Sequence, residues 1–278
     1  MKILITGIKG FLGRNLIKSL YKHELFGLGT DEETISNIRV FNSNNLDKLE
    51  MDIDLVIICH AAVASGTITI SNEKLFNVNV LLTEKIIDKF KSASLIYIST
   101  TSVYDMNADC VTESSNVNPQ SNYSLSKLWA EKIISINKKS VILRISSMFG
   151  IGMKENTLIP NYVNKAVKNG LIEVWGKGSR LQNYIHVDDV VQYINLIIQN
   201  QENLYGKILL GVSKKQYSNL EIAQIILKNT EGKINFINED NSKSFCYNNK
   251  YTTDLLNWEP QVDIEERLKK YIEWKKEY

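Results

Sequence analysis

The chain has few cysteines, no long apolar run and almost no excess of charge of either sign. Its three cysteines, Cys59, Cys110 and Cys246, are scattered, and no CxxC pair occurs. The sequence therefore predicts neither a disulfide framework nor a metal site, and this cysteine usage favours a reducing cytoplasm. With 33 basic and 31 acidic side chains, the net charge of +2 does not indicate a nucleic-acid partner.

Targeting and membrane segments are also absent from the pattern. No apolar run reaches the length that crosses a membrane, so no membrane partner is expected. A strand-like run begins at residue 2, which leaves no room for a signal peptide. The apolar content of 44% and the charged content of 23% are typical of a soluble globular protein. The length of 278 residues suffices for one large domain or two closely joined ones, and no repeat or low-complexity linker divides it.

The N-terminus carries a glycine turn between a strand and a helix. Residues 2–5 are apolar and strand-like, Gly7, Gly10 and Gly13 follow, and apolar residues then recur at helical spacing. This order is typical of a dinucleotide-binding unit, although an ordinary β–α turn is the alternative. Gly7 permits a tight turn, Gly10 lets the backbone approach a pyrophosphate, and Gly13 lets the helix pack closely on its strand. The helix N-terminus would then bind the pyrophosphate through free N–H groups and its dipole.

The second strand bears on the choice of cofactor. Residues 25–28 read as a strand, and an NAD-binding unit should end this strand in an acid that bonds the adenosine ribose. Gly29 stands there instead, followed by Thr30. The space left for a 2′-phosphate favours NADP(H), with NAD(H) as the alternative. Lys9 could pair with that phosphate or remain a solvated loop lysine, and Arg39 is a second candidate cation.

A third strand is followed by small residues. Residues 54–59 are apolar after an initial acid, as a strand buried on both faces should be. Ala61 and Ala62 come next, and small side chains would let a cofactor lie across the strand end. His60 could be a catalytic base, but we interpret it as a packed or hydrogen-bonded histidine.

Hydroxyl groups and a tyrosine–lysine pair supply candidate acid–base chemistry. Residues 95–98 form another buried strand, and the four hydroxyl residues 99–102 follow at its carboxyl end, which in a parallel sheet faces the ligand crevice. Tyr123 and Lys127 are four apart and therefore share one face of a helix. An ammonium group beside a phenol favours the phenolate, and lowering a phenol pKa from 10 to 7 takes about 4 kcal/mol. Such a tyrosine can exchange a proton with a carbinol or ketone while hydride moves to or from a nicotinamide.

These stretches resemble a known enzyme family. Residues 6–13, 99–104 and 123–127 look like the motifs of the extended short-chain dehydrogenases/reductases, most of all the nucleotide-sugar epimerase, dehydratase and ketoreductase group, and the likeness continues through 143–150, 176–190 and 255–260. The resemblance implies an α/β fold, a Rossmann-type doubly wound parallel sheet of about seven strands, with a small C-terminal α/β substrate domain. It also implies a homodimer through helices at about 75–90 and 122–137, and a place in polysaccharide biosynthesis.

The resemblance further implies domain bounds and residue roles. We expect a dinucleotide-binding domain over 1–150, to which 184–213 returns, and a nucleotide-sugar-binding domain over 151–183 and 214–278. Tyr123 would be the acid/base, Lys127 would hold the nicotinamide ribose and lower the tyrosine pKa, and Thr100 would bond the reacting sugar oxygen. The predicted cofactor-binding residues are Gly7, Lys9, Gly10, Phe11, Leu12, Gly13, Thr30, Ala61, Ala62, Asn79, Ser99, Tyr123 and Lys127. The predicted substrate-binding residues are Thr101, Ser102, Ser147, Arg180 and Gln182.

Some residues depart from the family pattern. Thr101 and Ser102 stand where 4,6-dehydratases carry Asp-Glu, so the carboxyl pair that expels water is missing and a dehydratase is excluded. Gln182 stands where an arginine usually faces the nucleotide diphosphate, and Arg180 could replace it. Ser147 stands where an asparagine is frequent.

Three functions are therefore open. The first is NADPH-dependent reduction of a nucleotide-linked keto-sugar, which Gly29 and Lys9 favour. The second is a nucleotide-sugar epimerase that keeps NAD bound. The third is a non-catalytic protein that senses a dinucleotide on the same fold, which the joint presence of Thr100, Tyr123 and Lys127 disfavours.

Overall fold

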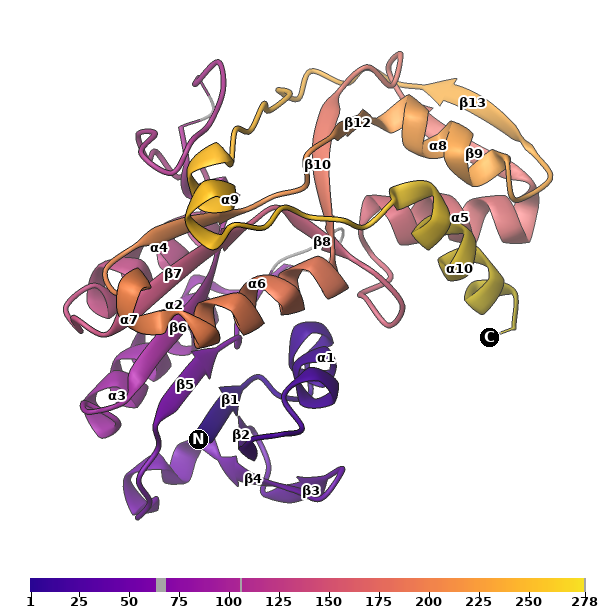
Figure 1. The fold of residues 1–278 in the computed structure, drawn as a ribbon. Coiled ribbons are helices and arrows are strands. Elements are labelled where there is room, and N and C mark those ends of the chain that lie inside the picture. Colours follow the sequence, from indigo (N-terminus) through magenta and orange to yellow (C-terminus); the bar gives the residue numbers. More distant parts are fainter. Residues whose placement is uncertain (64–68, 106, 278) are drawn as a thin grey trace.

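The computed structural model describes residues 1–63, 69–105 and 107–277, and its largest element is an eight-stranded sheet (Figure 1). The strands of this sheet are β1 (Lys2–Thr6), β2 (Glu24–Gly29), β3 (Glu33–Ile35), β4 (Ile38–Asn42), β5 (Leu55–Ile58), β6 (Ser94–Thr100), β7 (Ser140–Ile145) and β11 (Ile208–Gly211). Their order is β11-β7-β6-β5-β1-β2-β4-β3. Every neighbouring pair is parallel except β3 with β4. The prediction of a parallel sheet of about seven strands is thus confirmed, and β3 adds an antiparallel edge that was not foreseen.

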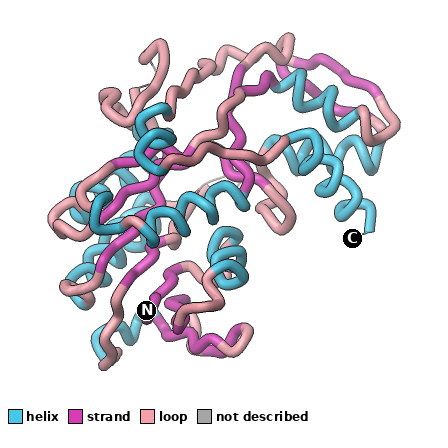
Figure 2. Tube along the Cα trace, viewed as in Figure 1, coloured by secondary structure: helices cyan, strands magenta, loops and turns pink. Residues whose placement is uncertain are grey.

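Helices cover both faces of this sheet (Figures 1 and 2). They are α1 (Phe11–Ser19), α2 (Asn72–Phe76), α3 (Leu82–Lys89), α4 (Asn122–Ile134), α6 (Val187–Gln199) and α7 (Gln201–Leu204). Because strand residues alternate between faces, Ile3 and Ile5 join an apolar cluster with residues of α1 and α6, whereas Leu4 joins a second cluster with residues of α3 and α4. Burial on both faces explains why β1 and β5 are almost wholly apolar, and it confirms the doubly wound arrangement.

A smaller part of the chain lies beyond the carboxyl ends of the strands (Figure 1). Its strands are β8 (Ser147–Phe149), β9 (Leu171–Trp175), β10 (Leu181–His186), β12 (Gln216–Ser218) and β13 (Lys233–Ile237), and its helices are α5 (Leu158–Asn169), α8 (Asn219–Leu227), α9 (Lys250–Leu256) and α10 (Ile264–Glu277). The strands form a sheet in the order β12-β10-β8 and a pair of β13 with β9. Val163, Ile172, Ile222 and Leu268 are buried together where α5, β9, α8 and α10 meet, which gives this part its own apolar core.

Two helices begin with a capping box, and the helix expected over about 75–90 is more complex than expected. Ser121 caps α4 and Ser218 caps α8, and in each case the cap and the third helical residue bond each other reciprocally. The helical pattern expected over about 75–90 is built from α2, a π-helical segment Asn77–Leu81 and α3. π-Helical turns are often found at functional sites, and this one carries Asn79.

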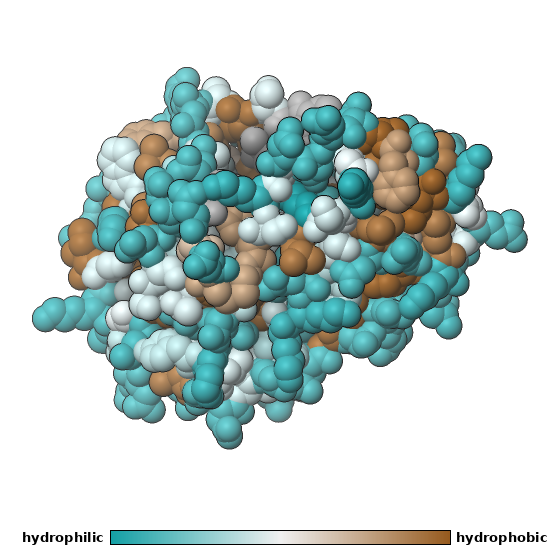
Figure 3. All heavy atoms as spheres, turned by 90° about the horizontal axis from the view of Figure 1, so that it is seen from above, coloured by the Kyte–Doolittle hydropathy of each residue, from teal (hydrophilic) through white to brown (hydrophobic). Residues whose placement is uncertain are grey.

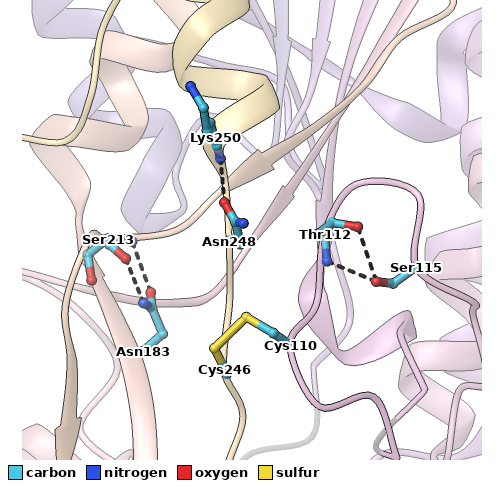
Figure 4. The surroundings of a disulfide bond; sticks show 8 residues. All are labelled: Cys110, Thr112, Ser115, Asn183, Ser213, Cys246, Asn248 and Lys250. Atoms are coloured by element: carbon cyan, nitrogen blue, oxygen red, sulfur yellow. Dashed lines mark hydrogen bonds between the residues drawn. A yellow bond between two sulfur atoms is a disulfide. The ribbon is translucent and has the colours of Figure 1, made fainter.

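The cysteine prediction was wrong. Cys110 and Cys246 form a disulfide that joins residues 136 positions apart in the sequence (Figure 4). Sequence spacing gave no sign of this pair, because the two cysteines come together only through the path of the chain. Cysteine usage therefore no longer supports the inference of a reducing cytoplasm, since disulfides are rare there.

Neither a membrane-spanning helix nor a metal-binding cluster is found among the described residues. No helix in residues 1–63, 69–105 and 107–277 is both long and apolar enough to cross a bilayer. Within the same ranges, no group of three or more His, Cys, Asp or Glu residues is placed to hold a metal ion.

On the face shown in Figure 3, hydrophilic side chains are widespread and apolar ones form patches between them.

Candidate active site

A cavity of about 670 Å³ lies at the carboxyl ends of β1, β5 and β6, between the two parts of the chain. Most of the predicted site residues line it, namely Gly7, Gly10, Phe11, Leu12, Gly13, Ala61, Ser99, Thr100, Thr101, Ser102, Tyr123, Lys127, Ser147, Arg180 and Gln182. Four predicted cofactor residues, Lys9, Thr30, Ala62 and Asn79, are not part of its lining. The topology explains the convergence, because parallel strands bring their carboxyl ends to one edge of the sheet.

The glycine turn has the geometry that its spacing predicts. Gly7 follows β1 with φ of +64°, and a Cβ there would lie 2.9 Å from the His60 Cα. A Cβ on Gly13 would lie 2.6 Å from the carbonyl oxygen of Gly7, so both positions require glycine. Gly10 caps α1 without a side-chain hydrogen bond, which leaves the first N–H groups of the helix free to bind an anion.

Lys9 forms ion pairs with two carboxylates. Its ammonium nitrogen lies 3.3 Å from the Asp31 carboxylate and forms a second ion pair with Glu33, and these partners raise the Lys9 pKa. Thr30 in turn donates a hydrogen bond of 2.7 Å to Asp31. The pairing with a 2′-phosphate that the sequence suggested for Lys9 is therefore replaced by pairing with two acids of the chain itself. Arg39, the second candidate cation, is paired with Glu32 at 3.2 Å.

Asn79 is a buried residue that stabilises the backbone next to the cavity. Its side-chain oxygen accepts a bond from the Ala62 N–H at 2.7 Å, and its nitrogen donates to the Ala62 carbonyl at 3.1 Å and to the Ser126 hydroxyl at 2.9 Å. The amide is fully buried and fully bonded. Asn79 therefore connects the segment after β5 to α4 through Ser126, the residue before Lys127.

His60 is a structural histidine, as the sequence analysis proposed. Its Nδ1 is hydrogen-bonded to the Thr6 hydroxyl at 2.7 Å and its Nε2 to the Thr83 hydroxyl at 3.2 Å. Burial, together with the nearby charge of Lys127, lowers the His60 pKa to about 3. With both nitrogens bonded and the ring neutral, His60 has no free group for proton transfer.

Tyr123 and Lys127 differ from the expectation in their electrostatics. The Lys127 ammonium donates to the Ile98 carbonyl at 2.7 Å and lies 4.0 Å from the centre of the Tyr97 ring. Burial lowers the Lys127 pKa to about 7 and raises the Tyr123 pKa to about 12. The expected lowering of the phenol pKa is therefore absent, because desolvation by burial determines the shift of Tyr123.

A buried ion pair holds the helix of these two residues against the sheet. Glu131, one turn after Lys127 on α4, receives two bonds from the Arg144 guanidinium on β7, at 3.0 and 2.6 Å. Ser99, at the end of β6, donates to the same carboxylate at 2.5 Å. The Ser99 hydroxyl is thus already bonded. Glu131 supports the site from outside the cavity lining, and the sequence analysis missed it, although its spacing of four from Lys127 was visible.

Thr100 and Thr101 are hydrogen-bonded to different neighbours. The Thr100 hydroxyl accepts from the Ser102 N–H at 3.2 Å and contacts the Ser102 hydroxyl at 3.0 Å, so it begins the short 3₁₀ turn Thr101–Val103. The Thr101 hydroxyl accepts from the Tyr247 hydroxyl at 3.2 Å. Tyr247 comes from a segment that the sequence did not single out.

The far wall of the cavity is basic and polar. The charged side chains among the described lining residues are Lys127, Lys154 and Arg180, and none of those lining residues is Asp or Glu. Gln182 donates to the Asn219 side chain at 2.7 Å, and Arg180 donates to the Lys243 carbonyl at 3.3 Å. The missed lining residues include Lys154, Thr157, Asn183, Phe245 and Tyr247. They carry no recognisable motif, because only the fold brings them to the cavity.

Comparisons with known proteins agree with this arrangement. Residues 3–211 match the family described as NAD dependent epimerase/dehydratase. A dTDP-D-glucose 4,6-dehydratase of Dictyostelium discoideum is 27% identical over 269 residues, which cover 81% of this chain and 61% of that protein. The chain thus spans less than two thirds of the length of that relative. A putative UDP-glucose 4-epimerase of Methanocaldococcus jannaschii is 25% identical over 312 residues and is covered to 98%, with 99% of this chain aligned.

A solved structure shows the same fold over the whole chain. The UDP-glucuronic acid 4-epimerase from Bacillus cereus, in complex with UDP-glucuronic acid and NAD, has a TM-score of 0.87 at 22% identity, and the alignment covers 99% of this chain and 100% of that one. Neither reduction of a keto-sugar nor a preference for NADP(H) finds support in these relatives. The motifs, the doubly wound fold and the match over residues 3–211 together lead to one conclusion: the chain belongs to the NAD dependent epimerase/dehydratase family of enzymes, within the extended short-chain dehydrogenases/reductases.

Proposed function

We propose that this protein is an NAD-dependent nucleotide-sugar epimerase. The proposal rests on the single cavity that joins the glycine turn to Thr100, Tyr123 and Lys127, with cations but no acids among its described lining residues. Cationic side chains suit the diphosphate of a nucleotide sugar. A dehydratase would need carboxyl groups beside the sugar to expel water, and the lining has hydroxyls there. The similarity to a putative 4-epimerase over nearly the whole chain also supports this choice.

The residues present fit a dinucleotide, and we propose NAD. The bare N-terminus of α1 and the glycine turn leave room for a pyrophosphate against the backbone. Asp31 and Glu33 surround the one cation of the glycine loop, so a 2′-phosphate placed near Lys9 would meet two carboxylates. This charge pattern replaces the argument for NADP(H) that the absence of an acid at Gly29 had suggested.

Side chains of the protein would accept and return the proton of the reacting sugar hydroxyl. When bound, NAD accepts a hydride from the sugar carbinol and can return it to the opposite face of the ring. Tyr123 would take the proton from the reacting hydroxyl and give it back after the hydride has returned, so the reaction is redox-neutral. Thr100 would hold the reacting oxygen, and Lys127 would stabilise the phenolate and bind the nicotinamide ribose.

The two parts of the chain would divide recognition between them. We propose that residues 1–150 and 184–213 bind the dinucleotide, and that 151–183 and 214–278 bind the nucleotide end of the sugar. Arg180 is the cation proposed for the diphosphate, since Gln182 is engaged with Asn219. Ser102 and Ser147 remain proposed contacts of the sugar.

We also propose a homodimer through the helical segment of about 75–90 and α4. Phe76, Leu125 and Trp129 are large apolar side chains that are exposed by 36%, 51% and 52%, and the Phe76 and Trp129 rings meet edge to face at 5.3 Å. An exposed apolar group of this kind marks a protein interface. Sedimentation of the wild type and of a Trp129→Glu variant tests it: the wild type should be a dimer and the variant should dissociate. A monomeric wild type would contradict the proposal.

The function is tested by following cofactor and product together. The purified protein is incubated with NAD and, separately, with UDP-glucose, UDP-glucuronic acid or dTDP-glucose, and the sugar is analysed by NMR. We expect inversion at one carbon without net formation of NADH. Tyr123→Phe should abolish most of this turnover, because general acid–base catalysis contributes about 10²–10⁴-fold, and Tyr251→Phe, at an exposed tyrosine outside the cavity, serves as the control.

Other outcomes separate the alternatives. Stoichiometric consumption of NADPH with a keto-sugar nucleotide would identify the reductase instead. Tight binding of NAD without turnover of any nucleotide-linked sugar would favour the dinucleotide sensor. Wild-type turnover in Tyr123→Phe would show that another group is the base.

A further inference from the structure

Tyr247 lies in the cavity although nothing in the sequence pattern marks it. Its hydroxyl donates to the Thr101 hydroxyl at 3.2 Å, and both residues line the cavity. Thr101 is the neighbour of Thr100, which we propose to hold the reacting oxygen. The two hydroxyls of Thr101 and Tyr247 thus form a polar wall next to the proposed reaction centre, and they come from segments 146 residues apart in the sequence.

The backbone of Tyr247 is fixed on one side by the loop after β6. The Val111 N–H donates to the Cys246 carbonyl at 2.8 Å, and the Asn248 N–H donates to the Val111 carbonyl at 2.8 Å. Val111 is fully buried in a small apolar cluster against which the Tyr247 ring packs. This pair of bonds is a parallel bridge centred on Val111 and Tyr247.

A covalent bond reinforces this bridge. The disulfide Cys110–Cys246 joins the residues that immediately precede Val111 and Tyr247 (Figure 4). Both cysteines are exposed, so the disulfide contributes no apolar packing to the core. Its effect on the fold is to hold the two segments in register beside the cavity.

The other side of the segment is fixed by β12. With its amide in the orientation that satisfies both partners, the Gln216 oxygen accepts from the Tyr247 N–H at 3.0 Å and its nitrogen donates to the Phe245 carbonyl at 2.8 Å. The Phe245 and Tyr247 rings lie stacked, with centres 6.1 Å apart. The phenol therefore has a defined position rather than that of a free surface tyrosine.

The Tyr247 hydroxyl is neutral at physiological pH. Burial raises the Tyr247 pKa, and the hydrogen bond to Thr101 and the charge of Arg180 oppose that rise only in part. A neutral phenol can donate one hydrogen bond and accept another. It can exchange its bond to Thr101 for bonds to a sugar hydroxyl at little cost.

We propose that Tyr247 is a specificity-determining residue that binds the hexose of the nucleotide-linked substrate, and that the Cys110–Cys246 disulfide positions it. The inference rests on the proposed function, because it names a contact of the same site. The predicted contact is a hydrogen bond between the Tyr247 hydroxyl and a polar group of the sugar, which replaces the bond to Thr101.

Tyr247→Phe tests the contact, since it removes the hydroxyl and keeps the stacked ring. The probes are UDP-glucose and UDP-glucuronic acid, with NAD saturating. We expect KM for the sugar that is turned over to rise about 2–10-fold, as for the loss of one neutral hydrogen bond, and the ratio of kcat/KM between the two sugars to change. NAD affinity should remain at the wild-type value, and Tyr251→Phe, in the same segment but exposed, should change neither quantity.

The role of the disulfide is tested by a double-mutant cycle. Cys110→Ser should raise KM in the same direction as Tyr247→Phe, and the double variant should show less than the product of the two effects, because both act through one phenol. Serine at Cys110 removes the disulfide but neither of the backbone hydrogen bonds of Val111, which keeps the change local. The effects of two independent changes would instead multiply, and that result would refute positioning by the disulfide.

Failure of the inference can be told from failure of the proposed function. If the wild type epimerises a UDP-sugar and Tyr247→Phe leaves KM and the sugar ratio unchanged, the contact is wrong while the function stands. A Tyr247→Phe variant that also loses NAD affinity would show a general structural role and overturn specificity. If the wild type turns over none of the UDP-sugars or dTDP-glucose, the proposed function and this inference fall together.

Discussion

Binding of NAD should lower the pKa of Tyr123 by several units. In the structure burial raises this pKa to about 12, which leaves about one phenol in 10⁵ ionised at pH 7. A base that works near neutrality would need its pKa lowered by about 5 units, or about 7 kcal/mol. Positive charge close to the phenol is the strongest source of such stabilisation.

Two positive charges near the phenol would lower the Tyr123 pKa by about the required amount. At an effective dielectric constant of 20, a unit charge about 5 Å away contributes about 3 kcal/mol, so about two such charges would be needed, and the Lys127 ammonium and an oxidised nicotinamide are the candidates. Neither charge suffices alone. The Lys127 pKa of about 7 also means that the lysine is only partly charged at neutrality. Proton transfer would thus be enabled only after the oxidised cofactor has bound.

Ultraviolet difference titration of tyrosinate measures this shift. The signal of Tyr123 is the wild-type curve minus that of Tyr123→Phe, recorded with and without saturating NAD. Without NAD, we expect no ionisation of Tyr123 below the pH at which the protein unfolds. With NAD bound, we expect Tyr123 to ionise with an apparent pKa several units lower than without it. Turnover should rise with pH through that same value, because the deprotonated phenol is the active form of the base. An identical difference curve with and without NAD would refute the reasoning.

Two further predictions concern charge pairs. Replacing Asp31 by Asn together with Glu33 by Gln should free Lys9 and shift preference severalfold from NAD towards NADP, as measured by fluorescence titration of both cofactors; an unchanged ratio would remove Lys9 from the ribose site. Glu131→Gln should lower the free energy of unfolding in urea by about 3–5 kcal/mol, because it leaves the Arg144 guanidinium buried without its anion. A loss below about 1 kcal/mol would show that water reaches this pair.

Local sequence patterns predicted the elements that depend on local physics. The apolar run of β1 and the glycine spacing are set by neighbours in the chain, and both were found as expected. The sequence predicted a doubly wound parallel sheet but not the order of its strands. Convergence of Thr100 and Tyr123 on one cavity is a consequence of that parallel arrangement.

Features that depend on distant segments were missed or misjudged. Lys9 looked available for a phosphate because β3, which brings Glu33 beside it, has no clear pattern in the sequence. The Cys110–Cys246 bond and the contact of Tyr247 with Thr101 require a return of the chain over more than a hundred residues, which spacing does not encode. The phenol pKa was misjudged for another reason: proximity of a lysine was counted and desolvation was not.

The buried ion pair connects these electrostatic features to the fold. Exchanging a buried ion pair for apolar residues is often neutral or stabilising, so stability alone does not explain why Glu131 and Arg144 occupy the core. Their bonds instead join α4 to β7, and the bond from Ser99 adds β6 to the same carboxylate. One turn before Glu131, Lys127 is thereby held where it reaches the carbonyl of Ile98 on β6. The charge of Glu131 also opposes the loss of the Lys127 proton on burial, which keeps that lysine able to be charged when the cofactor arrives.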